Sequence, residues 1–342
     1  MKKAILVTGG AGYIGSHIAY LLSQSGYLPI IIDSFNNNQV FNPLWAYVVK
    51  KKCTTEVFDE VFTTFPITAI VHCAASIEIP FSVQHPREFY ANNLTMSVEL
   101  INAAIKYKVP HFIFSSSCAV YGEPQYTPID ELHPLNPINA YGNSKLAIER
   151  LLADYVHAYE FSYTSLRYFN ASGAYPEKLL GEQHIPETHL IPRVLKSLAE
   201  NRPITIFGTN YNTPDGTCIR DYIHVLDIAR AHTDSLTYLL AGGKSDVFNL
   251  GTGTGYSTKQ VVETAARILQ TEPKIVYAPR RAGDAQTLIA DPRKAETVLQ
   301  WRPQQSDLES IITSAQKWEL IKLNWEGAHE KEFNSAGSLC SI

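Results

Sequence analysis

Short apolar runs and helical spacing alternate along the first half of the chain. The apolar runs show little alternation with polar residues, which predicts strands of a sheet that is covered on both faces. They occupy residues 4–7, 28–32, 47–49, 68–72, 111–115 and 162–167. Between them, apolar residues recur at helical spacing in residues 13–25, 55–65, 90–108 and 140–159. Strands that alternate with helices predict βαβ units, and therefore an α/β fold with a doubly wound parallel sheet of the Rossmann type.

The second half of the chain is less regular in its pattern of hydrophobic and polar residues. Proline and glycine recur through residues 176–216, which predicts a smaller and more irregular region of mixed α/β structure around one end of the sheet. Residues 247–250 are expected to return to the sheet, and residues 258–269 and 306–318 have helical spacing.

These patterns divide the chain into two domains and a tail. We expect residues 1–168 to form the sheet domain, with returns to its sheet near residues 205–250. Residues 169–325 are expected to form most of the second domain. The small and polar residues 327–342 are expected to be a flexible tail.

The composition excludes several classes of protein. The chain has 342 residues, of which 45% are hydrophobic and 18% charged, with a net charge of −4, as in an ordinary globular protein. No basic stripe indicates a nucleic-acid partner, and no apolar run approaches the roughly 20 residues that span a bilayer. The five cysteines form no CxxC pair. Neither a disulfide framework nor a metal site is therefore expected, and a cytoplasmic location fits best.

A glycine-rich turn joins the first predicted strand to the first predicted helix. Residues 8–15 read TGxxGxxG, the context in which glycines cradle the pyrophosphate of a dinucleotide at a helix N-terminus. Gly9 permits the tight turn, Gly12 lets the backbone approach the pyrophosphate, and Gly15 lets the helix pack closely on the strand. Asp33 ends the second predicted strand, where a carboxylate binds the ribose hydroxyls of NAD and repels the extra phosphate of NADP. A glycine turn of another α/β protein, and a helix cap at Asp33, are the plainer alternatives.

Tyr141 and Lys145 lie four residues apart at the start of a predicted helix, so both face the same side. Tyrosine is a poor base at neutral pH, but a nearby ammonium and the positive nicotinamide of NAD would favour its phenolate. Residues 115–117 are three serines directly after a predicted strand, where parallel sheets bind their ligands. By itself each feature could be a surface pair or a polar strand end; together they predict an acid–base site.

The order and spacing of several segments resemble a known family. TGGAGYIGSH, SSSCAVYG, YGNSK and RYFNASGA resemble the extended short-chain dehydrogenases/reductases. IFGTNYNTPDGTCIRDYIHVLDIARAH (residues 206–232) and APRRAGD (residues 278–284) resemble the UDP-glucose 4-epimerases within that family. The resemblance covers roughly residues 3–320.

The resemblance implies roles for individual residues. Ser117 matches the catalytic serine, Tyr141 the base and Lys145 its partner. NAD is implied as the cofactor, bound by Gly9, Gly12, Tyr13, Ile14, Gly15, Asp33, Ala74, Asn92, Ser115, Tyr141, Lys145 and Tyr168. A UDP-sugar is implied as the substrate, bound by Ser117, Tyr141, Asn170, Arg220, Arg281 and Asp284. The implied reaction is reversible epimerisation of UDP-glucose and UDP-galactose at C4 through a 4-keto intermediate, and the implied assembly is a homodimer formed through residues 92–108 and 140–159.

Three alternatives stay open to different degrees. A 4,6-dehydratase needs a carboxylate pair beside the serine, whereas Ser117 is followed by Cys118, Ala119 and Val120, so elimination is disfavoured. A 4-epimerase of UDP-GlcNAc or of a UDP-uronate is not excluded, because Leu288 stands where the family adjusts room for an N-acetyl group. A non-catalytic protein that binds NAD or a UDP-sugar is the alternative of another class.

One region departs from the family. An ungapped alignment places Lys51 where the family has an aspartate that binds the adenine amino group, and lysine offers no acceptor. Residues 34–46 are also fewer than usual for the family. Both changes concern the adenine end, so we expect NAD to be bound more weakly and to exchange.

Overall fold

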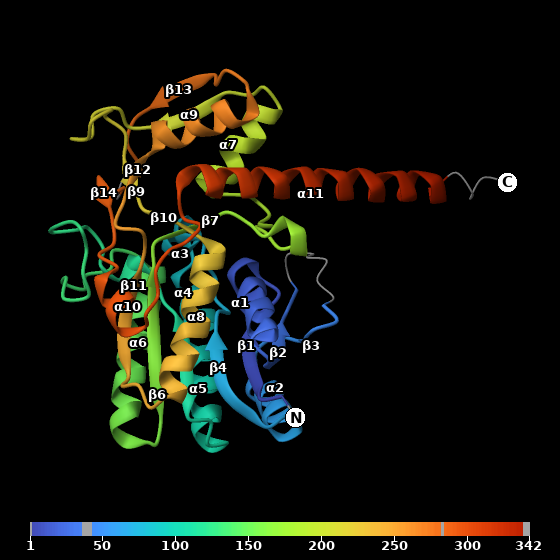
Figure 1. Cartoon of the computed structure of the whole chain (residues 1–342), viewed down its shortest axis with the longest axis vertical. Helices are drawn as coiled ribbons and strands as arrows, with labels where there is room; N and C mark the ends of the chain where they lie inside the picture. The colour runs from blue at the N-terminus through green and yellow to red at the C-terminus, as the bar shows by residue number, and fades with distance from the viewer. Residues whose placement is uncertain (1, 36–42, 282–283, 338–342) are drawn as a thin grey trace.

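The centre of the molecule is a parallel sheet. The computed structural model describes residues 2–35, 43–281 and 284–337, the last fourteen of them by their backbone alone (Figure 1). The strand order is β11-β6-β5-β4-β1-β2-β3, and every pairing is parallel. The strands are β1 (Ala4–Thr8), β2 (Leu28–Asp33), β3 (Tyr47–Lys50), β4 (Ile67–His72), β5 (His111–Ser115), β6 (Ser162–Tyr168) and β11 (Asp246–Leu250). The order reverses direction between β1 and β4, which is where such sheets open a crevice for ligands.

Helices cover both faces of this sheet because strands such as β1 are apolar on both sides. In β1, Ala4 and Leu6 belong to one buried cluster and Ile5 and Val7 to the other. The first cluster packs against α2 (Thr55–Thr64), α5 (Met96–Lys106) and α6 (Ala140–Ala158). The second packs against α1 (Tyr13–Gln24), α8 (Val225–Leu240) and α10 (Arg293–Val298).

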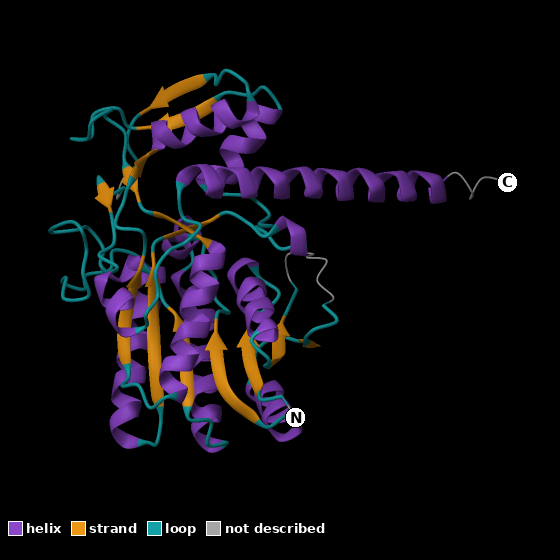
Figure 2. Cartoon of the chain, in the orientation of Figure 1, coloured by secondary structure: helices purple, strands orange, loops and turns teal. Residues whose placement is uncertain are grey.

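A smaller region lies beyond the carboxyl ends of the strands (Figure 2). A third apolar cluster joins helices α7, α9 and α11 with strand β8. Its elements include short sheets and the helices α7 (Leu190–Ala199), α9 (Thr258–Leu269) and α11 (Leu308–Gly337). The short strands are β7 (Asn170–Ser172), β8 (Ile204–Phe207), β9 (Ile219–Arg220), β10 (Tyr222–His224), β12 (Tyr256–Ser257), β13 (Ile275–Ala278) and β14 (Thr287–Leu288).

Short helical turns occur in the connections. Two of them, α3 (Ile79–Gln84) and α4 (Pro86–Phe89), follow β4. Three more are not α-helical: a π-helix at Tyr90–Thr95 and 3₁₀ turns at Cys118–Val120 and Pro176–Lys178. None of the helices in the described part of the chain is long and apolar enough to cross a membrane.

The predicted fold class is confirmed, and so is the return of residues 247–250 to the sheet as β11. Three local expectations need correction. The strand near residue 205 does not join the central sheet, because β8 pairs with β13 instead. The helix expected over residues 90–108 begins as the π-helix and becomes α-helical only at Met96.

The expected tail is the third correction. Helix α11 continues to Gly337, past residue 327, where the sequence predicts flexible chain. The segment contains no proline, and its glutamate, lysine and alanine residues favour helix. Residues 338–342 lie outside the described part of the chain, as do residues 36–42 of the short connection after β2.

Candidate active site

The glycine turn after β1 is held against β4 by close backbone contact. Gly9 has a φ of 67°, and a Cβ there would lie 2.7 Å from the backbone nitrogen of Ala74. A Cβ at Gly15 would lie 2.1 Å from the carbonyl oxygen of Gly9, so α1 can approach the turn only without a side chain. No side chain caps α1 at Gly12. The first backbone amides of this helix are therefore available to an anion, as the sequence predicts.

Asp33 braces this turn from the end of β2. Its carboxylate accepts hydrogen bonds from the backbone amides of Ala11, at 3.0 Å, and Phe35, at 2.9 Å. Lys51, which the alignment places at the adenine end, points elsewhere: its Nζ lies 2.6 Å from Glu60 Oε2 on the exposed surface. Cys53 and its neighbours Lys52 and Thr54 line the cavity there instead.

One cavity of about 1330 Å³ connects the glycine turn with the predicted catalytic and substrate residues. This volume exceeds the ~300–1,000 Å³ of an ordinary small-molecule pocket, as a site for both a dinucleotide and a second nucleotide requires. All but two of the predicted site residues line it: Gly9, Gly12, Tyr13, Ile14, Gly15, Asp33, Ala74, Asn92, Ser117, Tyr141, Tyr168, Asn170, Arg220, Arg281 and Asp284. Residues that are remote in sequence thus share one space.

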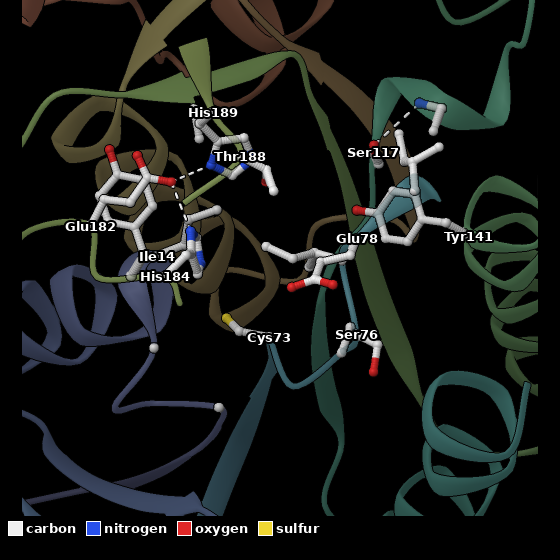
Figure 3. A pocket seen from close by; sticks show the side chains of 18 of the residues that line it. Ile14, Cys73, Ser76, Glu78, Ser117, Tyr141, Glu182, His184, Thr188 and His189 are labelled. Atoms are coloured by element: carbon white, nitrogen blue, oxygen red, sulfur yellow. Dashed lines mark hydrogen bonds and ion pairs between the residues drawn. The ribbon is translucent and has the colours of Figure 1, made fainter. Parts of the chain in front are cut away.

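Ser117 and Tyr141 face this cavity from neighbouring elements (Figure 3). Ser117 lies at the start of the 3₁₀ turn after β5, and its Oγ accepts a hydrogen bond from the Ala119 amide at 3.2 Å. Tyr141 lies in the first turn of α6, which Asn139 caps through the Gly142 amide. Burial raises the pKa of Tyr141 to about 12, although hydrogen bonding with Ser117 lowers it. The protein's own groups therefore keep the tyrosine protonated at neutral pH.

Lys145 and Ser115 lie behind the cavity wall. Lys145 is buried, its Nζ donates a hydrogen bond to the Ser115 carbonyl at 2.7 Å, and it lies 5.8 Å from the centre of the Tyr141 ring. Burial lowers the pKa of Lys145 to about 8. Ser115 Oγ lies 2.9 Å from His232 Nε2, so its hydroxyl belongs to a buried network. The Lys145 ammonium thus lies close to the Tyr141 ring on the same helix face.

A buried ion pair that the sequence reasoning missed lies one turn beyond Lys145. Glu149 and Arg167 are both about 4% exposed, and Arg167 Nη2 lies 2.5 Å from Glu149 Oε2. Ser116 donates a hydrogen bond to Glu149 at 2.5 Å, and Arg167 donates one to the Tyr121 hydroxyl at 2.9 Å. The network joins α6, the residue after β5, and β6. Helical spacing from Tyr141 through Lys145 to Glu149 was the available signal.

Asn92 and its neighbour Asn93 differ in burial and in the groups that they bind. Asn92 is exposed and lines the cavity, as predicted. Asn93 is buried, accepts a hydrogen bond from the Ser76 amide at 2.7 Å and donates one to the Ser76 carbonyl at 2.9 Å. The π-helix places both side chains against the loop after β4: Asn93 binds the backbone of Ser76, and Asn92 donates a hydrogen bond to the Ser76 hydroxyl at 2.8 Å beside the cavity.

Arg220, Arg281 and Asp284 gather at the far end of the cavity. Arg220 Nη2 lies 3.8 Å from Asp284 Oδ1, and the Arg281 guanidinium stacks 4.0 Å from the centre of the Phe207 ring. Two guanidinium groups that face a cavity can hold a diphosphate. Asn170, at the start of β7, lines the same space.

The connection between β7 and α7 forms a wall that sequence reasoning missed. Glu182, His184, Thr188 and His189 line the cavity, opposite Ser117 and Tyr141 in Figure 3. Glu182, His184, Glu187 and His189 bring their ligand atoms within 4.8 Å of one another. The sequence carries one signal for this wall, the spacing Glu-x-His-x-x-Glu-x-His within a stretch interrupted by proline.

Comparison with known proteins decides the family. A family model described as the NAD dependent epimerase/dehydratase family matches residues 5–251. The chain belongs to this family. A protein of Rhizobium meliloti (strain 1021) named UDP-glucose 4-epimerase is 44% identical to it, over 92% of this chain and 96% of that one.

Solved structures agree. The UDP-glucose 4-epimerase of Brucella ovis in complex with NAD is 41% identical, with a TM-score of 0.87 over 92% of this chain and 97% of that one. The UDP-Glc/GlcNAc 4-epimerase of Campylobacter jejuni is 39% identical, with a TM-score of 0.80 over 93% of this chain and 99% of that one. These matches confirm the resemblance, the Rossmann-type fold and the class of NAD-dependent epimerase that the sequence indicates.

Proposed function

We propose that this enzyme interconverts UDP-glucose and UDP-galactose by reversible, NAD-dependent epimerisation at C4 through a 4-keto intermediate. The observation that carries the proposal is the shared cavity: Ser117 and Tyr141 line it together with the glycine turn and Arg220. The relatives named UDP-glucose 4-epimerase support the choice of substrate.

The residues at one end of the cavity fit NAD. Gly9 and Gly15 leave no room for a side chain between the turn, β4 and α1, and the uncapped amides of α1 suit a pyrophosphate. Asp33 retains acceptor capacity beside its two amide partners and lines the cavity. When bound, NAD supplies a hydride acceptor, and then a hydride donor, for the sugar C4.

Asp33 should decide between NAD and NADP. We expect Asp33→Ala to weaken NAD binding about tenfold, which is about 1.4 kcal/mol, because the ribose loses its acceptor and the glycine turn loses its brace. NADP should bind relatively better because the carboxylate no longer repels its phosphate. Titration of both dinucleotides by fluorescence measures this, with exposed Asp59→Ala as the control. An unchanged ratio of the two affinities would remove Asp33 from the cofactor site.

Tyr141 and Ser117 would handle the proton. The Tyr141 phenolate would take the proton of the C4 hydroxyl, and the Ser117 hydroxyl would donate a hydrogen bond to the same sugar oxygen. Because burial raises the pKa of Tyr141 to about 12, a positive charge has to favour the phenolate. Lys145 behind the wall and the positively charged nicotinamide ring of bound NAD are the groups that can provide it.

Inversion requires the 4-keto sugar to present its other face at the same place. The chain must then hold the diphosphate while it leaves the sugar free to turn. Arg220 and Arg281, at the end of the cavity remote from the glycine turn, would serve as this anchor, with Asn170 and Asp284 beside them.

The two parts of the chain would then have separate tasks. Residues 1–168 would bind NAD and residues 169–325 most of the UDP-sugar. A homodimer formed through α5 and α6 remains a prediction from the resemblance, and a cytoplasmic location remains a prediction from the cysteines.

An assay of the purified chain tests the proposal. We expect turnover of UDP-galactose, and dependence on added NAD after dialysis if the departures near Lys51 loosen the cofactor. UDP-GalNAc should be tested beside it, because Leu288 lines the cavity and the similar Campylobacter jejuni enzyme is named for both sugars. Turnover of UDP-GalNAc alone would move the substrate assignment. No turnover of either sugar with excess NAD would contradict the proposed function.

A further inference from the structure

Four potential metal ligands converge on the segment between β7 and α7. Glu182 Oε1 lies 2.9 Å from His184 Nδ1 and is in contact with His189 Nδ1 as well (Figure 3). Glu187 completes the group, and one ligand atom from each of the four side chains lies within 4.8 Å of the others. Two imidazole nitrogens and two carboxylates are a donor set that zinc accepts. Among the residues that the structure describes, these four are the group of histidine and carboxylate side chains whose ligand atoms lie close enough together to hold a metal ion.

The cluster has an unused oxygen. Glu187 Oε1 accepts a hydrogen bond from the His189 amide at 2.8 Å, whereas Glu187 Oε2 is buried and has no hydrogen-bond partner. A buried carboxylate oxygen without a partner is unfavourable, because it has lost its solvation and gained no hydrogen bond. A cation among the four side chains would give this oxygen a ligand and would remove that cost.

The negative charge of the carboxylates in this cluster also favours a bound cation. Three carboxylates, those of Glu182, Glu187 and Glu319, influence one another here, and Glu319 is paired with Lys322 at 2.6 Å. With both imidazoles neutral, the group carries a net charge of −2. A divalent cation would balance the charge at a pH where imidazole is neutral.

We propose that Glu182, His184, Glu187 and His189 form a binding site for a divalent transition metal ion, zinc above all. The site goes beyond the proposed epimerisation and does not depend on the identity of the sugar. Its segment lies against Tyr13 of α1, whose pKa the two glutamates raise in addition to burial, and against Trp318 of α11, which donates a hydrogen bond to the Glu182 carbonyl at 2.7 Å. The bound ion would therefore fasten the cavity wall to elements of both parts of the fold.

Metal binding by the whole chain tests this directly. Protein stripped with a chelator and dialysed should take up one equivalent of zinc in a calorimetric titration. Affinity should rise from about pH 6 to about pH 8, because the metal displaces protons from the histidines. Cobalt(II) in place of zinc should give the strong visible absorption of four-coordinate nitrogen and oxygen ligation.

Variants assign the uptake to these residues. His184→Ala/His189→Ala should lower zinc affinity at least 100-fold, and Glu187→Gln, which keeps the side-chain volume, about tenfold. His157→Ala, at an exposed position in the last turn of α6, should bind zinc as the wild type does. Circular dichroism shows whether each variant is folded, and Glu187→Gln preserves the test if the double variant is not. Zinc uptake that is absent, or equal in the wild type and Glu187→Gln, would overturn the proposal whatever the enzyme's activity on UDP-galactose.

Discussion

Tyr141→Phe should lower kcat for UDP-galactose by about 10²–10⁴-fold, the range attributed to a positioned acid–base group. The substitution removes one hydroxyl from a side chain that is 7% exposed, so packing against Phe89 should persist. NAD binding and thermal stability should therefore stay close to those of the wild type. Steady-state kinetics with saturating NAD, together with a cofactor titration, separate loss of chemistry from loss of binding.

The pH dependence of activity, compared between the wild type and Tyr141→Phe, tests the role of Tyr141 more specifically. A base acts only when deprotonated, so activity should rise with pH toward the pKa of Tyr141 and then level off. Burial places that pKa at about 12 in the protein alone, so a plateau well below pH 12 would measure how far the bound cofactor's charge lowers it. The rising limb should vanish in Tyr141→Phe.

A matched substitution controls for the loss of a buried hydroxyl. Tyr163, on β6, is also 7% exposed but does not line the cavity. Tyr163→Phe should leave kcat within about twofold, since it touches neither substrate nor cofactor. If Tyr141→Phe retained wild-type activity, the enzyme would need another base, and the non-catalytic alternative would gain support.

Arg167→Met should lower the free energy of unfolding by about 3–5 kcal/mol, because it leaves Glu149 charged and unpaired in the core. Glu149 is bound by the Arg167 guanidinium and by Ser116, and both ionic partners are about 4% exposed. Denaturant unfolding, followed by circular dichroism, measures the change.

Two further variants separate burial from charge. Lys106→Ala removes an ion pair of similar length, at 2.8 Å to Asp59, but its side chains are 58% and 37% exposed. It should leave the free energy of unfolding nearly unchanged, because solvent screens surface pairs. Glu149→Leu/Arg167→Met removes both charges and should be more stable than Arg167→Met alone. An Arg167→Met protein as stable as wild type would show that the core pair is not what holds α6 to β6.

Lys51, which the family alignment assigns to the adenine end of the cofactor site, shows what an alignment alone can predict. The alignment gives the position of Lys51 in the chain, directly after β3, but not the direction of its side chain. In the structure this side chain points to Glu60 on the surface. The neighbouring residues Lys52 and Cys53 line the cavity instead. The contact with Glu60 of α2, and not the position of Lys51 in the sequence, therefore decides that this residue does not meet a ligand.

The sequence by itself determined the sheet and the glycine turn and predicted the proposed catalytic set, because each depends on short-range patterns. Apolar runs of β1, β2, β4 and β5 specify buried parallel strands, and the spacing of Gly9, Gly12 and Gly15 specifies a turn that excludes side chains. Tyr141 and Lys145 share a helix face by spacing alone.

Only the tertiary structure decided which distant side chains meet. Glu149 pairs with Arg167 from another element, and the buried hydrogen bonds of Asn93 hold the loop at Ser76. The four ligands of residues 182–189 converge because an irregular connection folds against α1 and α11, and no periodicity encodes its path. Burial then sets the charge of Tyr141, since desolvation depends on everything packed around a group and not on its neighbours in sequence.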